Sequence, residues 1–391
     1  MEEGLLHAVQ GYMYPNEVEL QWSILIVLYP FTTGLVAGAF ILASLERVFN
    51  VAAVKPTYRL ALLSALAFLL VAPLPLQLHL GHPERSIEMY LTPHTSSAMA
   101  MFGFIYLWYL MAVLVLEIWL DYRKDMVLMA RSETGWKKTL YRVLTLGVDN
   151  ISEESLRIDD KLGRFITIVG IPSALLLHGY VGFIFGSVKA NPWWSTPVMP
   201  IVFLFSAIVS GIALVLLMYM LICFLKNIPI DMPCVDTIAR YLMYAFLVDF
   251  TLEMLDMIHR IYEADESFKS LDFMVHTRLY TSSLVQIVFG TIIPIAMLAF
   301  IQLVKLSDAA RKGLYALAGL LTLMGIFAMR WNVVIGGQLF SKSFLGYTTY
   351  KMAFATKEGL LPAILLMILP FGILWGLVKL LPPFDEEKAA V

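Results

Sequence analysis

The sequence predicts an all-α, polytopic integral membrane protein with nine or ten transmembrane helices in two helical bundles. Hydrophobic residues make up 59% of its 391 positions, and the mean hydropathy is +0.76. Only 15% of the residues are charged, whereas a soluble domain carries about a quarter. Apolar runs near 20 residues recur along the chain, and that is the length a helix needs to cross a bilayer.

The same composition excludes three other classes of protein. The net charge is −2, so no basic surface for nucleic acid is expected. Low charge and 13% aromatic residues exclude a disordered chain. Two cysteines are too few for a secreted disulfide framework.

Nine apolar runs are predicted to be membrane spans. In order they are 20–46, 57–80, 97–121, 162–188, 197–225, 236–260, 279–306, 311–331 and 360–381. The long first and seventh runs are expected to be tilted or to extend past the membrane. A tenth span would reverse the side of one terminus, and this alternative stays open.

Charge sets the expected orientation. The first 19 residues hold Glu2 and Glu3 but no Lys or Arg, unlike the basic start of a cleaved signal peptide. With the N-terminus outside and the C-terminus inside, 19 of the 28 Lys and Arg residues fall on the inner side, as the positive-inside rule requires.

The predicted organisation has three parts. Residues 1–19 form an outer N-terminal segment, 20–188 a first helical bundle, and 189–391 a second bundle with a short inner tail. The longest inner segment, 122–161, contains apolar residues at helical spacing, namely Trp136, Leu140, Val143 and Leu144. This segment is either a helix on the inner leaflet or a plain connector.

Motifs for resident cofactors are missing from the sequence. Cys223 and Cys234 form no CxxC or four-cysteine set, so neither an iron–sulfur cluster nor c-type haem is expected. No Walker A motif or dinucleotide fingerprint is present. Of the seven histidines, only His79 and His178 lie in or at the edge of spans at a plausible depth, and their depths do not match, which disfavours b-haem. No metal site is predicted.

The sixth predicted span carries ionisable residues on one helix face. Asp249, Glu253, Asp256 and Arg260 follow one another at helical spacing. Charged side chains inside a membrane are costly and are functional candidates by default. The carboxylates can pass protons; alternatively, they are structural and are neutralised by Arg260, Arg330 or Arg278. We assign Asp249, Glu253, Asp256 and Arg330 to a proton pathway, with Glu117 at the inner end of the third span as an extension or a snorkelling side chain.

Three polar side chains are predicted at matched depth in the outer half of the membrane. They are Tyr29, His178 and Tyr180. Hydroxyl and imidazole groups can hydrogen-bond a quinone carbonyl and relay its proton; the alternative is a polar group satisfied between helices. His79, where the second span emerges, can close the pocket. Arg85, in the following loop, is expected to contact a partner.

Several stretches together resemble the NrfD/PsrC family of membrane subunits. The stretch at 170–211 resembles the fourth and fifth helices of that family, and it reads GIPSALLLHGYVGFIFGSVKANPWWSTPVMPIVFLFSAIVSG. Its elements are Tyr180–Gly182, Pro192–Trp194 and Pro200–Ser206. RWNVVIGGQ, Arg330 to Gln338, resembles a signature of the longer members. Among these, the chain looks most like the membrane subunit of the sulfate-reducer quinone reductase complex, then the hydrogenase-2 type.

The resemblance implies a site and partners. Menaquinone would bind toward the outer face, with Tyr180 matching the family's quinone-site tyrosine. Tyr29 stands where the polysulfide reductase type has a histidine, so His178 or His79 would supply an imidazole. A periplasmic ferredoxin-like iron–sulfur subunit would dock outside, contacting Arg85, Trp331 and Gln338. That subunit would be tied to a multihaem cytochrome c, a molybdopterin-type subunit or a hydrogenase subunit.

The resemblance therefore implies the quinone-interacting subunit of a respiratory oxidoreductase in the bacterial cytoplasmic membrane, not catalytic alone. Lipids would surround it, and proton uptake through the membrane would accompany electron exchange. Two alternatives stay open from the residues. A proton-coupled secondary transporter would use the same acidic face, and a non-catalytic membrane anchor would depend on the outer loops 81–96 and 332–359.

Overall fold

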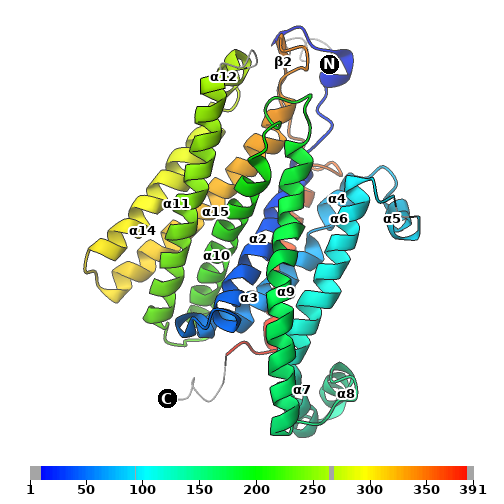
Figure 1. The fold of residues 1–391 in the computed structure, drawn as a ribbon, viewed down its shortest axis with the longest axis vertical. Helices are drawn as coiled ribbons and strands as arrows, with labels where there is room; N and C mark the ends of the chain where they lie inside the picture. The colour runs from blue at the N-terminus through cyan, green and yellow to red at the C-terminus, as the bar shows by residue number, and fades with distance from the viewer. Residues whose placement is uncertain (1–9, 93, 264–267, 385–391) are drawn as a thin grey trace.

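The chain folds into long helices that run roughly along one axis (Figure 1). The structure is a computed structural model that describes residues 10–92, 94–263 and 268–384. Six long helices are uninterrupted within these ranges: α2 (Ile24–Arg47), α9 (Glu153–Gly186), α10 (Met199–Leu225), α11 (Met232–Glu263), α15 (Asp308–Val334) and α16 (Leu360–Leu380). Helix α3 (Lys55–Val71) is followed directly by α4 (Leu74–His79). Two further long helices of the described chain contain a π-helical stretch: α6 (Ala98–Leu107) continues through Trp108–Val115 into α7 (Leu116–Ser132), and α13 (Tyr280–Leu284) continues through Val285–Ile292 into α14 (Ile293–Leu303).

The remaining elements are short and lie at the two ends of the bundle. They are the antiparallel strands β1 (Gln10–Gly11) and β2 (Gly346–Tyr347), the helices α5 (Glu88–Leu91), α8 (Gly135–Leu144) and α12 (Phe268–His276), and 3-10 turns at Pro15–Glu17, Ala52–Val54, Pro83–Ile87 and Gly336–Gln338. We call the end that carries β2 and α12 the upper end, and the end that carries α8 the lower end (Figure 1).

The prediction of a polytopic helical membrane protein is confirmed. Within the described residues, eight helical segments are long and apolar enough to cross a membrane, and they match eight of the nine predicted runs. The remaining predicted run, the sixth (236–260), lies on α11. This helix is not among the eight, because charged side chains interrupt its apolar sequence. Helix α11 nevertheless runs beside the others through the bundle (Figure 1). The count of nine spans and the division into two bundles stay predictions.

Several predicted boundaries move in the structure. The first span begins at Ile24 rather than at residue 20, because the Ser23 hydroxyl caps the helix by accepting from the Leu25 amide at 3.3 Å. Helices α7 and α9 extend well into the predicted inner segment 122–161. What remains between them contains α8, on which Trp136 is 73% exposed and Val143 64%.

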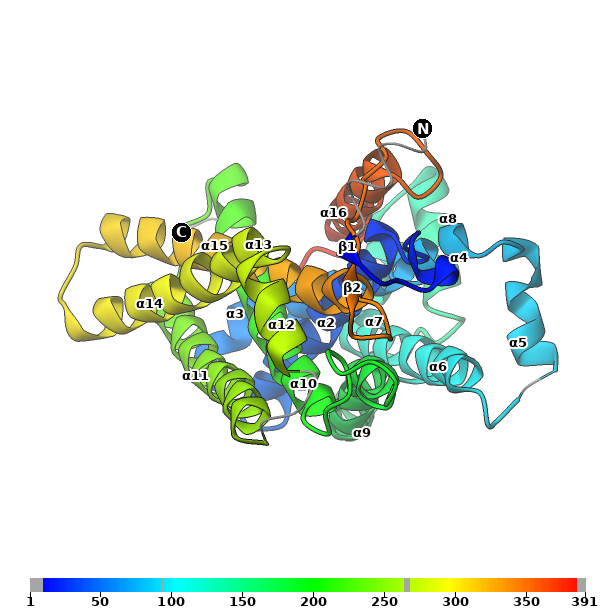
Figure 2. The same cartoon turned by 90° about the horizontal axis from the view of Figure 1, so that it is seen from above.

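Helix α2 occupies the centre of the bundle. Nearly all of its side chains are buried, and α3, α9, α10 and α15 pack around it (Figure 2). The approach to α10 is the closest: a Cβ added at Gly38 would lie 2.1 Å from the Ala207 carbonyl oxygen. Gly34 and Gly38 have the GxxxG spacing that lets helices approach closely; the close approach occurs at Gly38, whereas Gly34 faces the His178 ring.

Upper-end segments tie the start of α2 to the end of α15. The Gln338 side chain accepts from the Trp22 amide at 2.9 Å, and the Tyr350 hydroxyl accepts from the Ile24 amide at 3.1 Å. The indole groups of Trp193 and Trp194 donate to carbonyls in the last turn of α15. These bonds satisfy backbone groups that a helix end leaves without an intrahelical partner.

Candidate functional site

A fully buried polar cluster lies where four helices meet. His178 of α9 and Arg330 of α15 are both 0% exposed, and an Arg330 guanidinium nitrogen lies 3.0 Å from His178 Nε2. The other ring nitrogen of His178 lies 3.2 Å from the hydroxyl of Thr33 on α2. Arg330 also donates to Ser206 on α10 at 2.6 Å, and its guanidinium carbon lies 3.9 Å from the Phe203 ring centroid. One imidazole and one guanidinium thus connect α2, α9, α10 and α15.

The cluster continues electrostatically to Asp249 of α11. Asp249 is 2% exposed, and one of its carboxyl oxygens has no hydrogen-bond partner within the described ranges; the same holds for Nε of Arg330. Among the described residues, no carboxylate oxygen lies within 4.0 Å of the Arg330 guanidinium. Arg330 and Asp249 are therefore a buried cation and a buried acid that form no direct ion pair, and burying charged groups in this way costs free energy.

The remaining acids of the predicted face lie toward the upper end of α11. Glu253 accepts from the Gln286 amide at 3.3 Å, and Gln286 in turn accepts from Asn332 at 2.7 Å. Asp256 accepts from Thr196 at 2.6 Å and pairs with Arg260 at 3.0 Å. The shared face is thus confirmed for Glu253, Asp256 and Arg260, which line one pocket.

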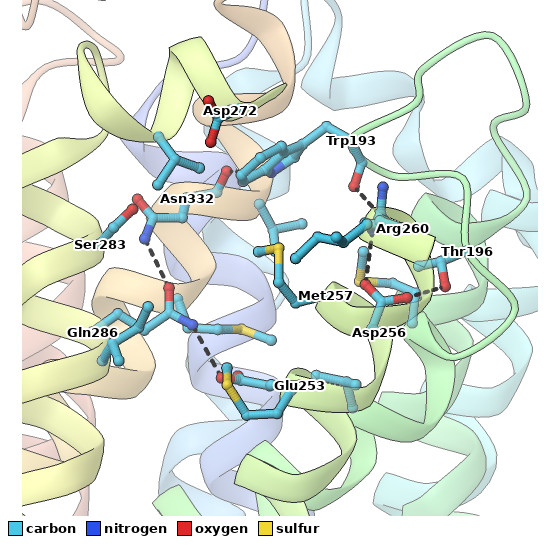
Figure 3. Close-up of a pocket in the computed structure, with 18 of the residues that line it drawn as sticks. Trp193, Thr196, Glu253, Asp256, Met257, Arg260, Asp272, Ser283, Gln286 and Asn332 are labelled. Carbon is cyan, nitrogen blue, oxygen red and sulfur yellow. Dashed lines mark hydrogen bonds and ion pairs between the residues drawn. The ribbon is translucent and has the colours of Figure 1, made fainter. Parts of the chain in front are cut away.

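This pocket has a volume of about 280 Å³. Figure 3 shows Gln286 and Asn332 on one side, with Asp256, Arg260 and Thr196 on the other. Trp193 closes the upper side, and Met257 lies between the two polar groups (Figure 3). The acidic face extends from Asp249 toward the upper end, roughly 16 Å along the helix to Arg260 at 1.5 Å per residue.

Tyr29 of α2 and Tyr180 of α9 lie around one phenylalanine, Phe102 of α6. The rings of Tyr29 and Phe102 meet edge to face with centroids 5.3 Å apart, and Phe102 stacks on Tyr180 at 6.3 Å. Tyr29 is 5% exposed, and its hydroxyl has no hydrogen-bond partner among the residues that the structure describes. His178 instead points to the Arg330 cluster, because residues two apart on a helix lie on nearly opposite faces.

The other predicted residues near the upper end have separate surroundings. His79 pairs with Glu358 at 2.8 Å, in the 332–359 loop. The Trp331 ring packs edge to face on Tyr350. Gln338 binds the backbone of Trp22, while Arg85 lies exposed in the 3-10 turn after α4. Within the described residues, His79 thus forms no hydrogen bond with Tyr29 or His178; its partner is Glu358.

Glu117 lies in a second buried polar site, near the lower end. It is 1% exposed, and one carboxyl oxygen accepts from Thr167 at 2.7 Å and from Tyr58 at 3.1 Å. Tyr58 also lines a lower-end pocket of about 730 Å³ whose wall includes Arg47 and Asp121. The side chain therefore does not snorkel to the surface but connects through one tyrosine to a polar pocket.

Some of these partners lay outside the sequence prediction. Thr33 and Thr167 sit inside apolar runs, where a hydroxyl draws no attention, and Ser206 appears there only as part of a family element and not as a site residue. Gln286 and Asn332 are uncharged amides, and each becomes significant only through its partner on another helix. A search for every polar residue facing the bundle interior, charged or not, would have found them.

The fold and these buried sites define a polytopic membrane protein with ionisable groups held between its helices. Residues 14–342 match the family model described as polysulphide reductase, NrfD. The chain belongs to this family. The family resemblance expected from the sequence is thus confirmed. The structure shows no group of three or more His, Cys, Asp or Glu residues that could hold a metal ion within its described residues.

Three relatives support this membership. The chain is 30% identical to a selenate reductase subunit of Mesobacillus selenatarsenatis, covering 94% of this chain and 87% of that one. It is 29% identical to a putative dimethyl sulfoxide reductase membrane subunit of Halobacterium salinarum, over 51% and 43% of the two chains. It is 27% identical to protein NrfD of Escherichia coli, over 51% and 59%.

Proposed function

We propose that the chain is the quinone-interacting membrane subunit of a respiratory reductase complex. Family membership and the relatives named as subunits of selenate and dimethyl sulfoxide reductases support this proposal. The chain would exchange electrons between menaquinone and an iron–sulfur subunit docked at the upper end, which would face the periplasm. The excess of Lys and Arg on the lower side supports that orientation. A molybdopterin-type, multihaem cytochrome c or hydrogenase subunit would complete the complex.

The quinone would bind beside Tyr29 and Tyr180. The observation that carries this assignment is the Tyr29 hydroxyl, which is buried and has no hydrogen-bond partner in the described part of the chain. Leaving a buried hydroxyl without a hydrogen bond costs about 1–3 kcal/mol. A quinone oxygen that accepted a hydrogen bond from the Tyr29 hydroxyl would remove that cost. His178 would act as a positioning residue, because it holds Thr33, whose hydroxyl donates to the Tyr29 carbonyl at 3.0 Å. His79 would act at the rim with Glu358.

The test is quinone-linked turnover of the purified complex. Tyr29→Phe and Tyr180→Phe each remove one hydroxyl while keeping the ring, and each is expected to raise KM for the quinone about tenfold, equivalent to about 1.4 kcal/mol. Tyr106→Phe is the matched control, since the Tyr106 hydroxyl already donates a hydrogen bond to the Leu69 carbonyl oxygen. Unchanged KM in the double variant Tyr29→Phe, Tyr180→Phe would rule out this site.

We further propose that protons reach the quinone through buried carboxyl groups. Glu117, joined to the lower-end pocket by Tyr58, supports entry from the lower side. Asp249 and Glu253 would continue the route on the other side of the Arg330 cluster. Since Asp249 to Arg260 occupies the upper half of α11, this face by itself does not reach the lower end.

Charge movement in liposomes tests the proton route. The complex, reconstituted with a quinone pool, would be assayed for turnover and for membrane potential. Asp249→Asn and Glu253→Gln are expected to lower the charge moved per electron. Asp236→Asn is the matched control, because that acid lies lower on the same helix and already pairs with Arg311. Full charge movement in both variants would make these acids structural.

A further inference from the structure

The pocket beside α11 has polar groups on two opposite walls. One wall is a hydrogen-bonded chain from Glu253 through Gln286 to Asn332. The other is Thr196, Asp256 and Arg260, and Figure 3 shows the two walls facing one another across Met257. A ligand in this space would therefore meet hydrogen-bonding groups at two opposite edges.

Between these walls the lining is apolar and soft. Four methionines contribute to it, together with the Trp193 indole; the methionines are Met199, Met254, Met257 and Met329. Thioether sulfur and indole both make favourable contacts with a flat aromatic ring. The volume of about 280 Å³ lies near the lower limit of roughly 300 Å³ for small-molecule sites, which suits one ring system without its tail.

The rim of the pocket is apolar and exposed. Met257 is 38% exposed and Ile261 is 53% exposed, and both line the pocket. Neighbouring residues on the outer face of α11 are also apolar and exposed, including Leu255 and Ile258. A hydrocarbon tail attached to a bound ring could therefore leave sideways along a surface that suits lipid.

The charges of the lining disfavour a phospholipid headgroup. Glu253, Asp256 and Asp272 contribute three carboxyl groups, against one guanidinium, from Arg260. That guanidinium is already occupied by Asp256 and by the carbonyl oxygens of Pro192 and Trp193. A phosphate would meet more carboxylate than cation, whereas a neutral ring with oxygens at opposite edges would meet donors and acceptors on both walls.

We propose that this pocket binds the ring of an isoprenoid quinone or quinol, as a second site distinct from the one at Tyr29 and Tyr180. The inference rests on the proposed function, because it assumes that the chain works with the quinone pool. The two sites would lie on opposite sides of the central His178–Arg330 cluster. Met329 lines this pocket, and its sulfur lies 3.1 Å from the Arg330 guanidinium, so the second ring would approach the cluster from the α11 side.

The experiment is a titration of the quinone-free complex in phosphatidylcholine nanodiscs with 2-heptyl-4-hydroxyquinoline N-oxide, a fluorescent flat-ring quinol analogue. We expect two equivalents bound per chain. Met257→Trp fills the space between the walls and is expected to remove one equivalent. Leu255→Trp, on the exposed face of the same helix, is the matched control and is expected to keep both.

A milder variant covers the case in which Met257→Trp fails to fold. Gln286→Leu removes the amide from one wall and is expected to weaken one equivalent about tenfold, equivalent to about 1.4 kcal/mol, without affecting the other. Thermal unfolding of each variant shows whether it is folded.

The outcomes separate the two proposals. If wild type binds only one equivalent, and that equivalent is kept in Met257→Trp and weakened in the double variant Tyr29→Phe, Tyr180→Phe, the second site is overturned and the proposed function stands. Loss of an equivalent in Leu255→Trp as well overturns the pocket assignment. Phospholipid that stays in the pocket of the purified chain and blocks the analogue also overturns it. No analogue binding, together with no quinone-linked turnover, refutes the proposed function itself.

Discussion

The contact between α2 and α10 at Gly38 leads to a stability prediction. Gly38→Ala would place a methyl group 2.1 Å from the Ala207 carbonyl oxygen, 2.8 Å from Gly211 Cα and 2.9 Å from Gly211 N. All three atoms are backbone, so no side chain can rotate away. An ordinary contact is about 3.5 Å or more, so the two helices must separate by roughly 1 Å.

The expected cost follows from that separation. Overpacking a tight interior costs about 1–3 kcal/mol, and we expect Gly38→Ala to lower the free energy of unfolding by that amount. Because Thr33 on α2 and Ser206 on α10 contact the His178–Arg330 cluster, quinone-linked turnover should also fall. A methyl at Gly211 would lie 2.4 Å from Gly38 Cα. The double variant should therefore cost less than the sum of the two, since one separation serves both.

Thermal unfolding in detergent, followed with a thiol-reactive fluorescent dye, measures this cost. Cys223 and Cys234 are free and both 0% exposed, so the dye reports unfolding. Gly372→Ala on α16 is the matched control, because a Cβ there meets no described atom within 4 Å. A Tm for Gly38→Ala equal to that of wild type and of the control would refute the close-contact argument.

Three further predictions use the polar contacts. Arg260→Met should destabilise the fold by about 1–3 kcal/mol and speed proteolysis in the loop 187–198, since Arg260 donates to two carbonyls there; unchanged cleavage would contradict this. Asp236→Asn should change stability by about 1 kcal/mol or less, because its pair with Arg311 is partly exposed; a larger loss of Tm would show a buried role. Glu117→Gln should keep the Tm within a few degrees but lower charge movement in liposomes, and full charge movement would remove it from the proton route.

Hydropathy predicted the membrane helices well but not their ends. It detects only the apolar part of a helix, whereas α9 begins at Glu153, where Ser152 accepts from the Ser155 amide. A polar first turn with a serine cap is a helix start that no apolar run reveals. For the same reason α7 continues to Ser132, which shortens the predicted inner segment.

Within one helix, spacing predicted which side chains share a face; between helices, it did not predict which side chains meet. Glu253, Asp256 and Arg260 share a face because helical geometry is regular. Two residues at the same depth in the membrane can point to different sides of their helices. His178 accordingly contacts Arg330 and not the Tyr29–Phe102–Tyr180 group, although its depth matches theirs. The pairing of His79 with Glu358 joins residues 279 positions apart, and no local pattern in the sequence points to it.

The central position of α2 has a consequence for biosynthesis. Among the described membrane helices it leaves the ribosome first, and α9, α10 and α15, which cover it, are made later. It must therefore enter the bilayer exposed to lipid and exchange that lipid for protein as each neighbour arrives, as in two-stage insertion and assembly of membrane helices. Its covering is complete only after α15 and α16 have been synthesised. A chain truncated before α15 would leave Thr33 and His178 without Arg330 beside them.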